Sequence, residues 1–177
     1  DFEPEEQQRQ MTIRASIAPI VFNNTKVNFI DTPGYADFIG EVYAALNAVD
    51  SVLIVVDAIS GVQVQTDRVF NLAEDRPRAF FISRLDKQDA DFDASLANLK
   101  ESFAGVSFAP LVLPIGSGPD IEGVVDLVSM KAYTVSGGAE TEGDIPDDIR
   151  DRALALREQL VEAAAEGDDA ILEKYLE

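Results

Sequence analysis

The first half of the chain mixes two hydrophobic patterns. Residues 14–22 alternate loosely between apolar and polar side chains, the turn cluster Asn23-Asn24-Thr25 follows, and a second apolar run occupies residues 26–30. This pattern predicts an antiparallel hairpin. Two later runs, 52–56 and 79–82, are continuously apolar, which is typical of strands buried on both faces.

Apolar side chains at helical spacing follow these strands and predict helices over residues 36–48, 63–74 and 92–103. Strands that alternate with helices form a parallel sheet in α/β proteins. Such sheets bind ligands outside the carboxyl ends of their strands. Asp31 and Asp86 each follow a predicted strand, so both are expected at this edge of the sheet.

The pattern changes after residue 105. Short apolar runs separated by glycines predict short strands within 106–115, 123–127 and 132–135, and an acidic linker is expected over 137–146. The predicted elements end with two helices, an amphipathic one over 149–164 and a last helical stretch over 171–176.

These patterns divide the chain into two predicted parts, an α/β part over residues 1–105 and a smaller α+β subdomain over 106–177. A chain of 177 residues with 46% hydrophobic side chains can bury a substantial core. It contains no apolar run near the roughly 18–20 residues that crossing a membrane requires. We therefore expect no membrane partner.

The composition narrows the chemistry. The chain has no cysteine and no histidine, which excludes disulfides and thiolate metal sites and removes the commonest general base. The lack of cysteine fits a reducing cytoplasm, where we expect the protein. Its 33 acidic and 14 basic residues give a net charge of -19, so the chain should repel a nucleic-acid backbone rather than bind it by itself.

The most informative local motif is an apolar strand that ends at Asp31-Thr32-Pro33-Gly34. An aspartate at a strand end can reach magnesium through water, and a glycine three residues later lets a backbone N–H approach the terminal phosphate of a nucleotide. Asp-Thr-Pro-Gly is also good turn chemistry, and the spacing alone does not decide between the two.

Further motifs in a fixed order carry a resemblance. They are Arg9-Gln10-Met11-Thr12-Ile13, the stretch Asp31 to Phe38, the stretch Asp57 to Gln63, and Phe81-Ile82-Ser83-Arg84-Leu85-Asp86. In this order they resemble the translational GTPases, specifically elongation factor G. Residues 114–116, 123–132 and 145–177 are similar to the subdomain that this factor inserts in its GTPase domain. The likeness implies a P-loop GTPase-type, mostly parallel sheet with a smaller inserted α+β subdomain.

The resemblance implies a GTP site with two sides. Its phosphate side would be formed by Thr12, Asp31, Thr32, Pro33, Gly34 and Tyr35. Thr12 matches the switch I threonine that meets magnesium and the γ-phosphate, and Asp31 matches the switch II aspartate that holds magnesium through water. The N–H of Gly34 would meet the γ-phosphate.

The guanine side would be formed by Ser83, Arg84, Leu85 and Asp86. Asp86 matches the acceptor that pairs with the ring N–H and the amino group of guanine. Charge-assisted bonds of this kind contribute roughly 1.5–3 kcal/mol each, enough to reject adenine. The resemblance therefore implies GTP or GDP with magnesium as cofactors of the intact parent protein.

The sequence also departs from the family. Tyr35 stands where the family has the histidine that positions the attacking water, so we expect slower hydrolysis. Ser83 and Arg84 stand where the family has asparagine and lysine, which predicts weaker or less selective guanine binding. Gln10 occupies a position that is usually glycine. These departures resemble the elongation factor G-like paralogues more than the housekeeping factor.

The phosphate-cradling loop G-x-x-x-x-G-K-[ST] does not occur in the sequence, since none of the 11 glycines is followed by lysine. The resemblance places this loop before Asp1 and the loop that completes the guanine pocket beyond Glu177. We therefore expect a piece of a longer protein that lacks the first strand of its sheet. By itself it should be inactive as a GTPase and bind no cofactor firmly, and the apolar surface left by the missing strand should be exposed or covered by a neighbouring chain.

Three functions remain open. The first is GTP hydrolysis on the ribosome, driving translocation, in the intact parent. The second is a non-hydrolysing module that binds the ribosomal stalk protein through acidic residues of the insert, although an ordinary solvated helix face explains these charges at least as well. The acidic residues in question are Asp147, Asp148, Asp151, Glu158 and Glu162. The third is a ribosomal protection protein.

Overall fold

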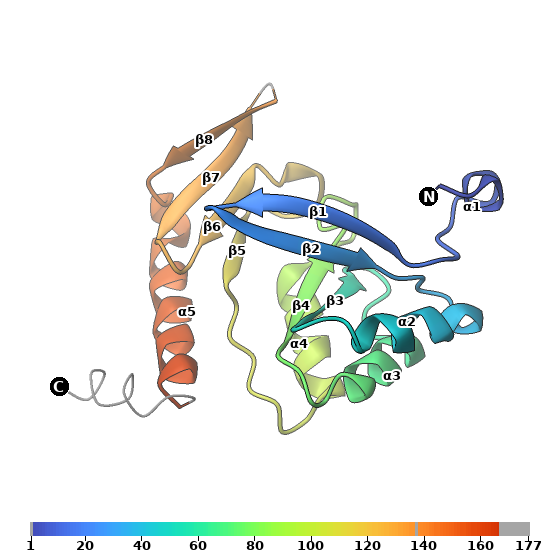
Figure 1. Ribbon diagram of the computed structural model, residues 1–177. Coiled ribbons are helices and arrows are strands. Elements are labelled where there is room, and N and C mark those ends of the chain that lie inside the picture. Colours follow the sequence, from blue (N-terminus) through green and yellow to red (C-terminus); the bar gives the residue numbers. More distant parts are fainter. Residues whose placement is uncertain (1, 137, 167–177) are drawn as a thin grey trace. The chain divides into compact units, whose positions relative to one another are not determined.

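The computed structural model describes residues 2–136 and 138–166. The chain forms two compact units, one from Asp1–Val56 and Val62–Phe81, the other from Asp57–Gly61 and Ile82–Glu177. Helices and strands are present in both (Figure 1), which confirms a mixed α/β protein. The predicted boundary after residue 105 stays a prediction.

The first unit holds the N-terminal elements. They are α1 (Pro4–Arg9), β1 (Ser16–Phe22), β2 (Thr25–Asp31), the 3-10 helix η1 (Ala36–Phe38), α2 (Ile39–Leu46), most of β3 (Val52–Asp57), α3 (Val64–Leu72) and most of β4 (Arg78–Ser83). The second unit holds α4 (Phe92–Ser102), β5 (Val112–Ile115), the 3-10 helix η2 (Gly118–Asp120), β6 (Gly123–Asp126), β7 (Lys131–Ser136), β8 (Ala139–Gly143) and α5 (Asp147–Glu166).

The predicted hairpin is confirmed. Strands β1 and β2 pair antiparallel with Phe22 opposite Thr25, so the turn consists of two residues. These residues, Asn23 and Asn24, have φ angles of 45° and 59°. Two left-handed residues make the turn whose twist matches the flanking strands, and asparagine tolerates this conformation better than most residues.

Strands β3 and β4 form a second sheet, separate from the hairpin. Val52 N–H donates to Pro77 O at 2.9 Å and Ala58 N–H donates to Ser83 O at 3.0 Å, so the bonded partners advance in the same direction along both strands. A larger, mostly parallel sheet stays a prediction, because in the described chain β2 pairs with β1 and not with β3.

The interpretation of residues 52–56 as a strand buried on both faces is wrong. Ile54 and Val56 are buried, but Leu53 and Val55 are 53% and 61% exposed. Successive side chains of a strand point to opposite faces, so one face of β3 is uncovered by the described residues. Apolar side chains of the hairpin are exposed as well, among them Ile17, Val21 and Phe22. Apolar surface is therefore exposed in the described chain, and whether a neighbouring chain covers it stays a prediction.

Helix α3 packs on β4 through aromatic side chains. The rings of Phe70 and Phe80 are stacked with centroids 5.7 Å apart, and the Arg78 guanidinium lies 3.9 Å from the centre of the Phe70 ring. Arg78 also donates to Phe70 O at 2.7 Å, which ties the end of α3 to the start of β4. Stacked aromatic pairs add about 0.5–1.5 kcal/mol beyond their buried area.

The second unit is built on a four-stranded antiparallel sheet in the order β5-β6-β7-β8. Its core contains Leu113, Val125 and Leu127, which are fully buried, and Ala153 of α5 packs against them. Arg157 of α5 donates to two carbonyl oxygens after β6, which fastens the helix to the sheet.

Among the described helices, none combines the length and the apolar composition needed to cross a membrane.

Two regions differ from the sequence predictions, and a third is not described by the structure. The expected acidic linker contains β8, which pairs with β7 and places Tyr133 opposite Glu142. All residues of β8 are exposed, so no alternation signalled a strand; a glycine turn and a cross-strand ion pair between Lys131 and Glu142 set its place. Of residues 106–115, only β5 is a strand. The stretch 171–176 lies outside the described residues.

The core of the second unit yields a test of its packing. We expect Leu113→Ala to lower the free energy of unfolding by about 2–5 kcal/mol, because the side chain is fully buried and its removal leaves a cavity. Leu111→Ala is the matched control, since Leu111 is 52% exposed and its loss should change stability by less than about 0.5 kcal/mol. Urea unfolding followed by circular dichroism measures both. Equal effects of the two variants would contradict the assigned core.

Candidate functional site

The residues predicted for the phosphate side all lie in the first unit. Asp31 is the last residue of β2 and is exposed, opposite Ser16 of β1. The loop that follows contains the buried Pro33 and leads into η1. Tyr35 caps the start of η1 with extended backbone and is 61% exposed. Its ring is therefore accessible to solvent.

Gly34 has open surroundings. A Cβ atom built on it would meet no heavy atom of the described chain within 4 Å. Packing within the described chain therefore does not require glycine at this position. A backbone without a side chain leaves room for another group to approach its N–H.

The segment around Thr12 is fixed by a residue that sequence reasoning missed, Glu6 of α1. Its carboxylate accepts hydrogen bonds from the backbone N–H groups of Ile13 at 2.8 Å and Arg14 at 3.0 Å. It also accepts from Phe2 and Glu3 at 2.8 Å and 3.2 Å. Bonds to Arg14 and Ile13 are the main reason that the pKa of Glu6 is lowered to about 2. A capping box from Glu3 to Glu6 with Pro4 at the first position was the available signal.

Gln10 has φ 52° and ψ 45° and caps the end of α1, with its N–H donating to Glu6 O. A left-handed backbone favours glycine, which explains why glycine suits this position. Three residues beyond Thr12, Ala15 N–H donates to the carboxylate of Glu41 in α2 at 2.8 Å. The segment is thus held by two different carboxylates.

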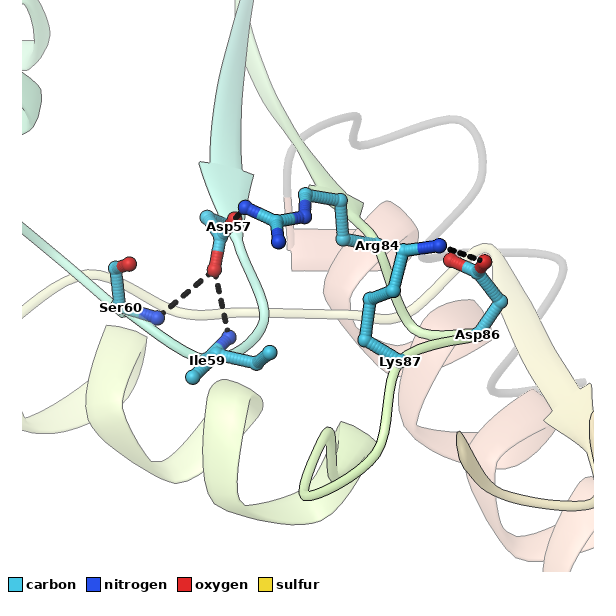
Figure 2. Close-up of polar contacts among 6 residues, drawn as sticks. All are labelled: Asp57, Ile59, Ser60, Arg84, Asp86 and Lys87. Carbon is cyan, nitrogen blue, oxygen red and sulfur yellow. Dashed lines mark hydrogen bonds and ion pairs between the residues drawn. The ribbon is translucent and has the colours of Figure 1, made fainter. Parts of the chain in front are cut away.

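The residues predicted for the guanine side lie in the second unit, at the end of β4 (Figure 2). Arg84 has φ 61°, and its guanidinium forms an ion pair with Asp57 at 2.7 Å. Leu85 is half-buried, and Asp86 is exposed with its carboxylate 2.8 Å from the Lys87 ammonium. Arg84 is therefore held by the residue that ends β3.

Asp57 also shapes the loop after β3. Its second oxygen accepts hydrogen bonds from Ile59 N–H and Ser60 N–H, both at 2.9 Å (Figure 2). These bonds lower the pKa of Asp57, with a further contribution from Arg84. Gly61 closes the loop with φ +63°, and a Cβ there would lie 2.6 Å from Oδ1 of Asn98. Only glycine fits without a shift of this side chain.

The pKa of Asp86 is lowered by the hydrogen bond and the charge of Lys87, which opposes a partial desolvation. Asp86 is therefore ionised at neutral pH and presents oxygen acceptors only. Ser83 precedes this loop, and its carbonyl accepts from Ala58 N–H at 3.0 Å. The loop after β3 and the loop after β4 thus form one hydrogen-bonded arrangement.

The residues of the predicted phosphate side thus lie in the first unit, and those of the predicted guanine side lie in the second. In the described part of the chain, no group of three or more His, Cys, Asp or Glu side chains gathers to hold a metal. A magnesium ion needs no such cage, because it keeps several waters and binds through one or two protein oxygens plus substrate phosphates. The hydroxyl of Thr12 and the carboxylate of Asp31 are oxygen donors of the kind that magnesium prefers.

Comparison with known proteins gives a consistent family. Residues 1–170 match the model of the family "Elongation factor Tu GTP binding domain". Over its whole length, the chain is 40% identical to elongation factor G of Thermotoga sp. (strain RQ2) and 35% identical to an elongation factor G-like protein of Thermotoga maritima. A crystal structure of a protein from Thermus thermophilus matches 99% of the chain with a TM-score of 0.90 at 37% identity. The chain spans 26% of the length of each of these proteins.

Glu6 provides a pH test of the geometry around Thr12. A carboxylate with a lowered pKa in the folded state contributes stability that is complete above its unfolded value of 4.5 and is lost as the pH falls through about 2. We expect the amide shifts of Ile13 and Arg14, followed by NMR, to stay constant down to about pH 3 and to change with a midpoint near 2. The variant Glu6→Gln should lack this transition. A midpoint near 4.5 would contradict the assigned hydrogen bonds.

Proposed function

Because the chain belongs to the elongation factor Tu GTP-binding domain family and, within it, to the elongation factor G group of translational GTPases, we propose that it supplies the switch and guanine-recognition parts of a GTP site. One observation carries this proposal: Asp86 stands exposed and ionised at the carboxyl end of β4, with its loop fixed by Asp57. An ionised carboxylate at this edge offers two acceptors to a base that presents two N–H groups side by side.

On the phosphate side, Thr12 and Asp31 would hold magnesium, and the Gly34 N–H would bind the γ-phosphate. When bound, the metal ion neutralises charge on the phosphate oxygens. Two features of the chain support these roles. The surroundings of Gly34 are open, and the backbone on both sides of Thr12 is anchored by Glu6. Thr32, Pro33 and Tyr35 complete this side of the proposed site.

On the guanine side, the ion pair with Asp57 directs the Arg84 guanidinium toward the loop after β3. The aliphatic part of Arg84 and the half-buried Leu85 then remain to contact a base. Ser83 supplies a shorter side chain than the family's asparagine, so it braces the loop less. We propose that guanine binding is retained but is weaker than in the housekeeping factors.

We further propose that the chain is the central part of a GTPase domain with a mostly parallel sheet over residues 1–105 and an inserted α+β subdomain over 106–177. In the longer protein this domain would hydrolyse GTP on the ribosome during translocation, in the cytoplasm. The chain by itself should not turn over GTP. Its sequence has no phosphate-cradling loop, and losing those charge-assisted bonds costs about 4–6 kcal/mol, a thousandfold or more in affinity.

Calorimetry with GTP and GDP in the presence of magnesium tests the proposal. We expect no measurable binding by this chain, and binding by the natural longer polypeptide that contains it together with a G-x-x-x-x-G-K-[ST] loop. In that polypeptide, Asp86→Asn should weaken GTP binding at least tenfold and improve binding of xanthosine triphosphate, because an amide offers one donor and one acceptor. Asp89→Asn is the control from the same exposed loop. If neither polypeptide bound GTP or GDP, the proposal would be overturned, and the acidic insert would be the part to study.

Tyr35 yields a second test in the longer protein. Tyrosine cannot take the charge states of histidine at neutral pH. We expect Tyr35→His to raise ribosome-stimulated GTP turnover by at least tenfold, within the range of general acid–base effects. Tyr35→Phe removes the hydroxyl and should leave the rate within about twofold. An unchanged rate in Tyr35→His would show that this position does not limit hydrolysis.

A further inference from the structure

The carboxylate of Glu6 is buried and holds the backbone on either side of another residue, Thr12. Its exposed fraction is 3%, and among the described residues only Ser95 is also a buried polar or charged residue. We propose that Glu6 is the positioning residue for Thr12: its carboxylate joins α1 to the segment that carries Thr12 and thereby presents Thr12 to the phosphate side. The inference rests on the proposed function, because that function gives Thr12 its role.

The hydrogen bonds of Glu6 flank Thr12 on both sides. Before it, Met11 N–H donates to the Glu6 carbonyl at 3.2 Å. After it, Ile13 N–H and Arg14 N–H donate to the same carboxylate oxygen, Oε1. The backbone at residue 12 therefore has a fixed neighbour on each side, and both neighbours are fixed by one residue. A displacement of α1 must move this segment with it.

The other carboxylate oxygen, Oε2, is engaged on the opposite side. It accepts from Phe2 N–H at 2.8 Å and from Glu3 N–H at 3.2 Å. The carboxylate thus links the residues before α1 to the residues after it. The six-residue helix α1, at the N-terminal end of the chain (Figure 1), lies between these two linked segments. This use of both oxygens explains why a residue in a short helix can hold a segment seven and eight positions away.

Only an ionised glutamate satisfies this geometry. All four groups that it contacts are N–H donors, so both oxygens must be acceptors. Glutamine has nearly the same shape, but its amide would direct donor hydrogens at one pair of N–H groups and leave that pair unsatisfied. Aspartate keeps the charge but is one methylene shorter, so it cannot span both pairs. Glu6→Gln therefore breaks one of the two pairs of hydrogen bonds, and with it the link between the chain before α1 and the segment after it, with little change in volume.

The first experiment uses this chain and needs no nucleotide. In Glu6→Gln, we expect the pair of amide hydrogens that loses its acceptor, Ile13 with Arg14 or Phe2 with Glu3, to exchange at least tenfold faster than in the unchanged chain. In Glu6→Asp, whose oxygens are withdrawn, we expect this change at Ile13 and Arg14. Exchange at Ile54 and Val56, buried in β3 of the same unit, should stay unchanged and would show that the unit remains folded. Glu5→Gln is the matched control, because Glu5 is exposed on the same helix. Unchanged exchange at Ile13 and Arg14 in both Glu6→Gln and Glu6→Asp would overturn the proposal.

A variant that fails to fold does not leave the question open. If Glu6→Gln also exposes Ile54 and Val56 to exchange, Glu6→Asp decides, since it retains the charge and withdraws the oxygens. Faster exchange at Ile13 and Arg14 alone in Glu6→Asp supports the proposal. Faster exchange throughout the unit in both variants would show that Glu6 supports folding in general, and would overturn the specific role.

The second experiment separates positioning from a structural effect. In the longer natural polypeptide, we expect Glu6→Gln to lower affinity for a non-hydrolysable GTP analogue at least tenfold and to leave GDP affinity within twofold, because Thr12 serves the γ-phosphate side. Glu5→Gln should change neither. Equal weakening of both nucleotides would overturn the positioning role. If the unchanged polypeptide binds neither nucleotide, the proposed function fails. This failure can be told apart from a failure of the positioning role, because the hydrogen-exchange measurement on this chain does not require nucleotide binding.

Discussion

Carboxylates that accept hydrogen bonds from backbone N–H groups hold the loops of this protein in shape. Glu6, Asp57, Asp91 and Asp126 each do so, at the ends of strands or at the start of a helix. A backbone N–H taken from water without an acceptor costs about 1–3 kcal/mol, and this cost bears most on the part-buried N–H groups that donate to Glu6. Part of the large acidic excess thus has a structural use, and the arrangement around both sides of the proposed site depends on it.

The sequence predicted the elements whose side chains repeat with a clear period. The hairpin and α5 were confirmed because asparagines mark the turn and apolar residues mark one helix face. Periodicity could not reveal α1 or β8, since their residues are almost entirely exposed and polar. Strand β8 is instead ordered by its pairing with β7, and α1 is held by the side chain of Glu6. The prediction that both faces of β3 are buried was wrong, because an apolar run does not show whether another element covers each face of the strand.

The candidate site shows the same division between what motifs reveal and what they leave out. The motifs named Thr12, Asp31 and Asp86. They included Asp57 but not its contact with Arg84, and they did not include Glu6, because motifs do not show which separate segments are in contact. Arg84 and Asp89 have φ angles of 61° and 69°. Left-handed backbone costs a residue other than glycine about 1–2 kcal/mol. This strain is retained where a loop is held from outside, and such loops are common at binding sites.

Strand β8 has a consequence for how copies of the protein behave together. It is the outer strand of its sheet, and its far edge pairs with no strand among the described residues. Open edges of this kind invite strand addition from a second molecule and the growth of aggregates. Glu140 and Glu142 place carboxylates along this short strand, so two such edges would bring like charges together. The acidic edge therefore acts against self-association of the protein.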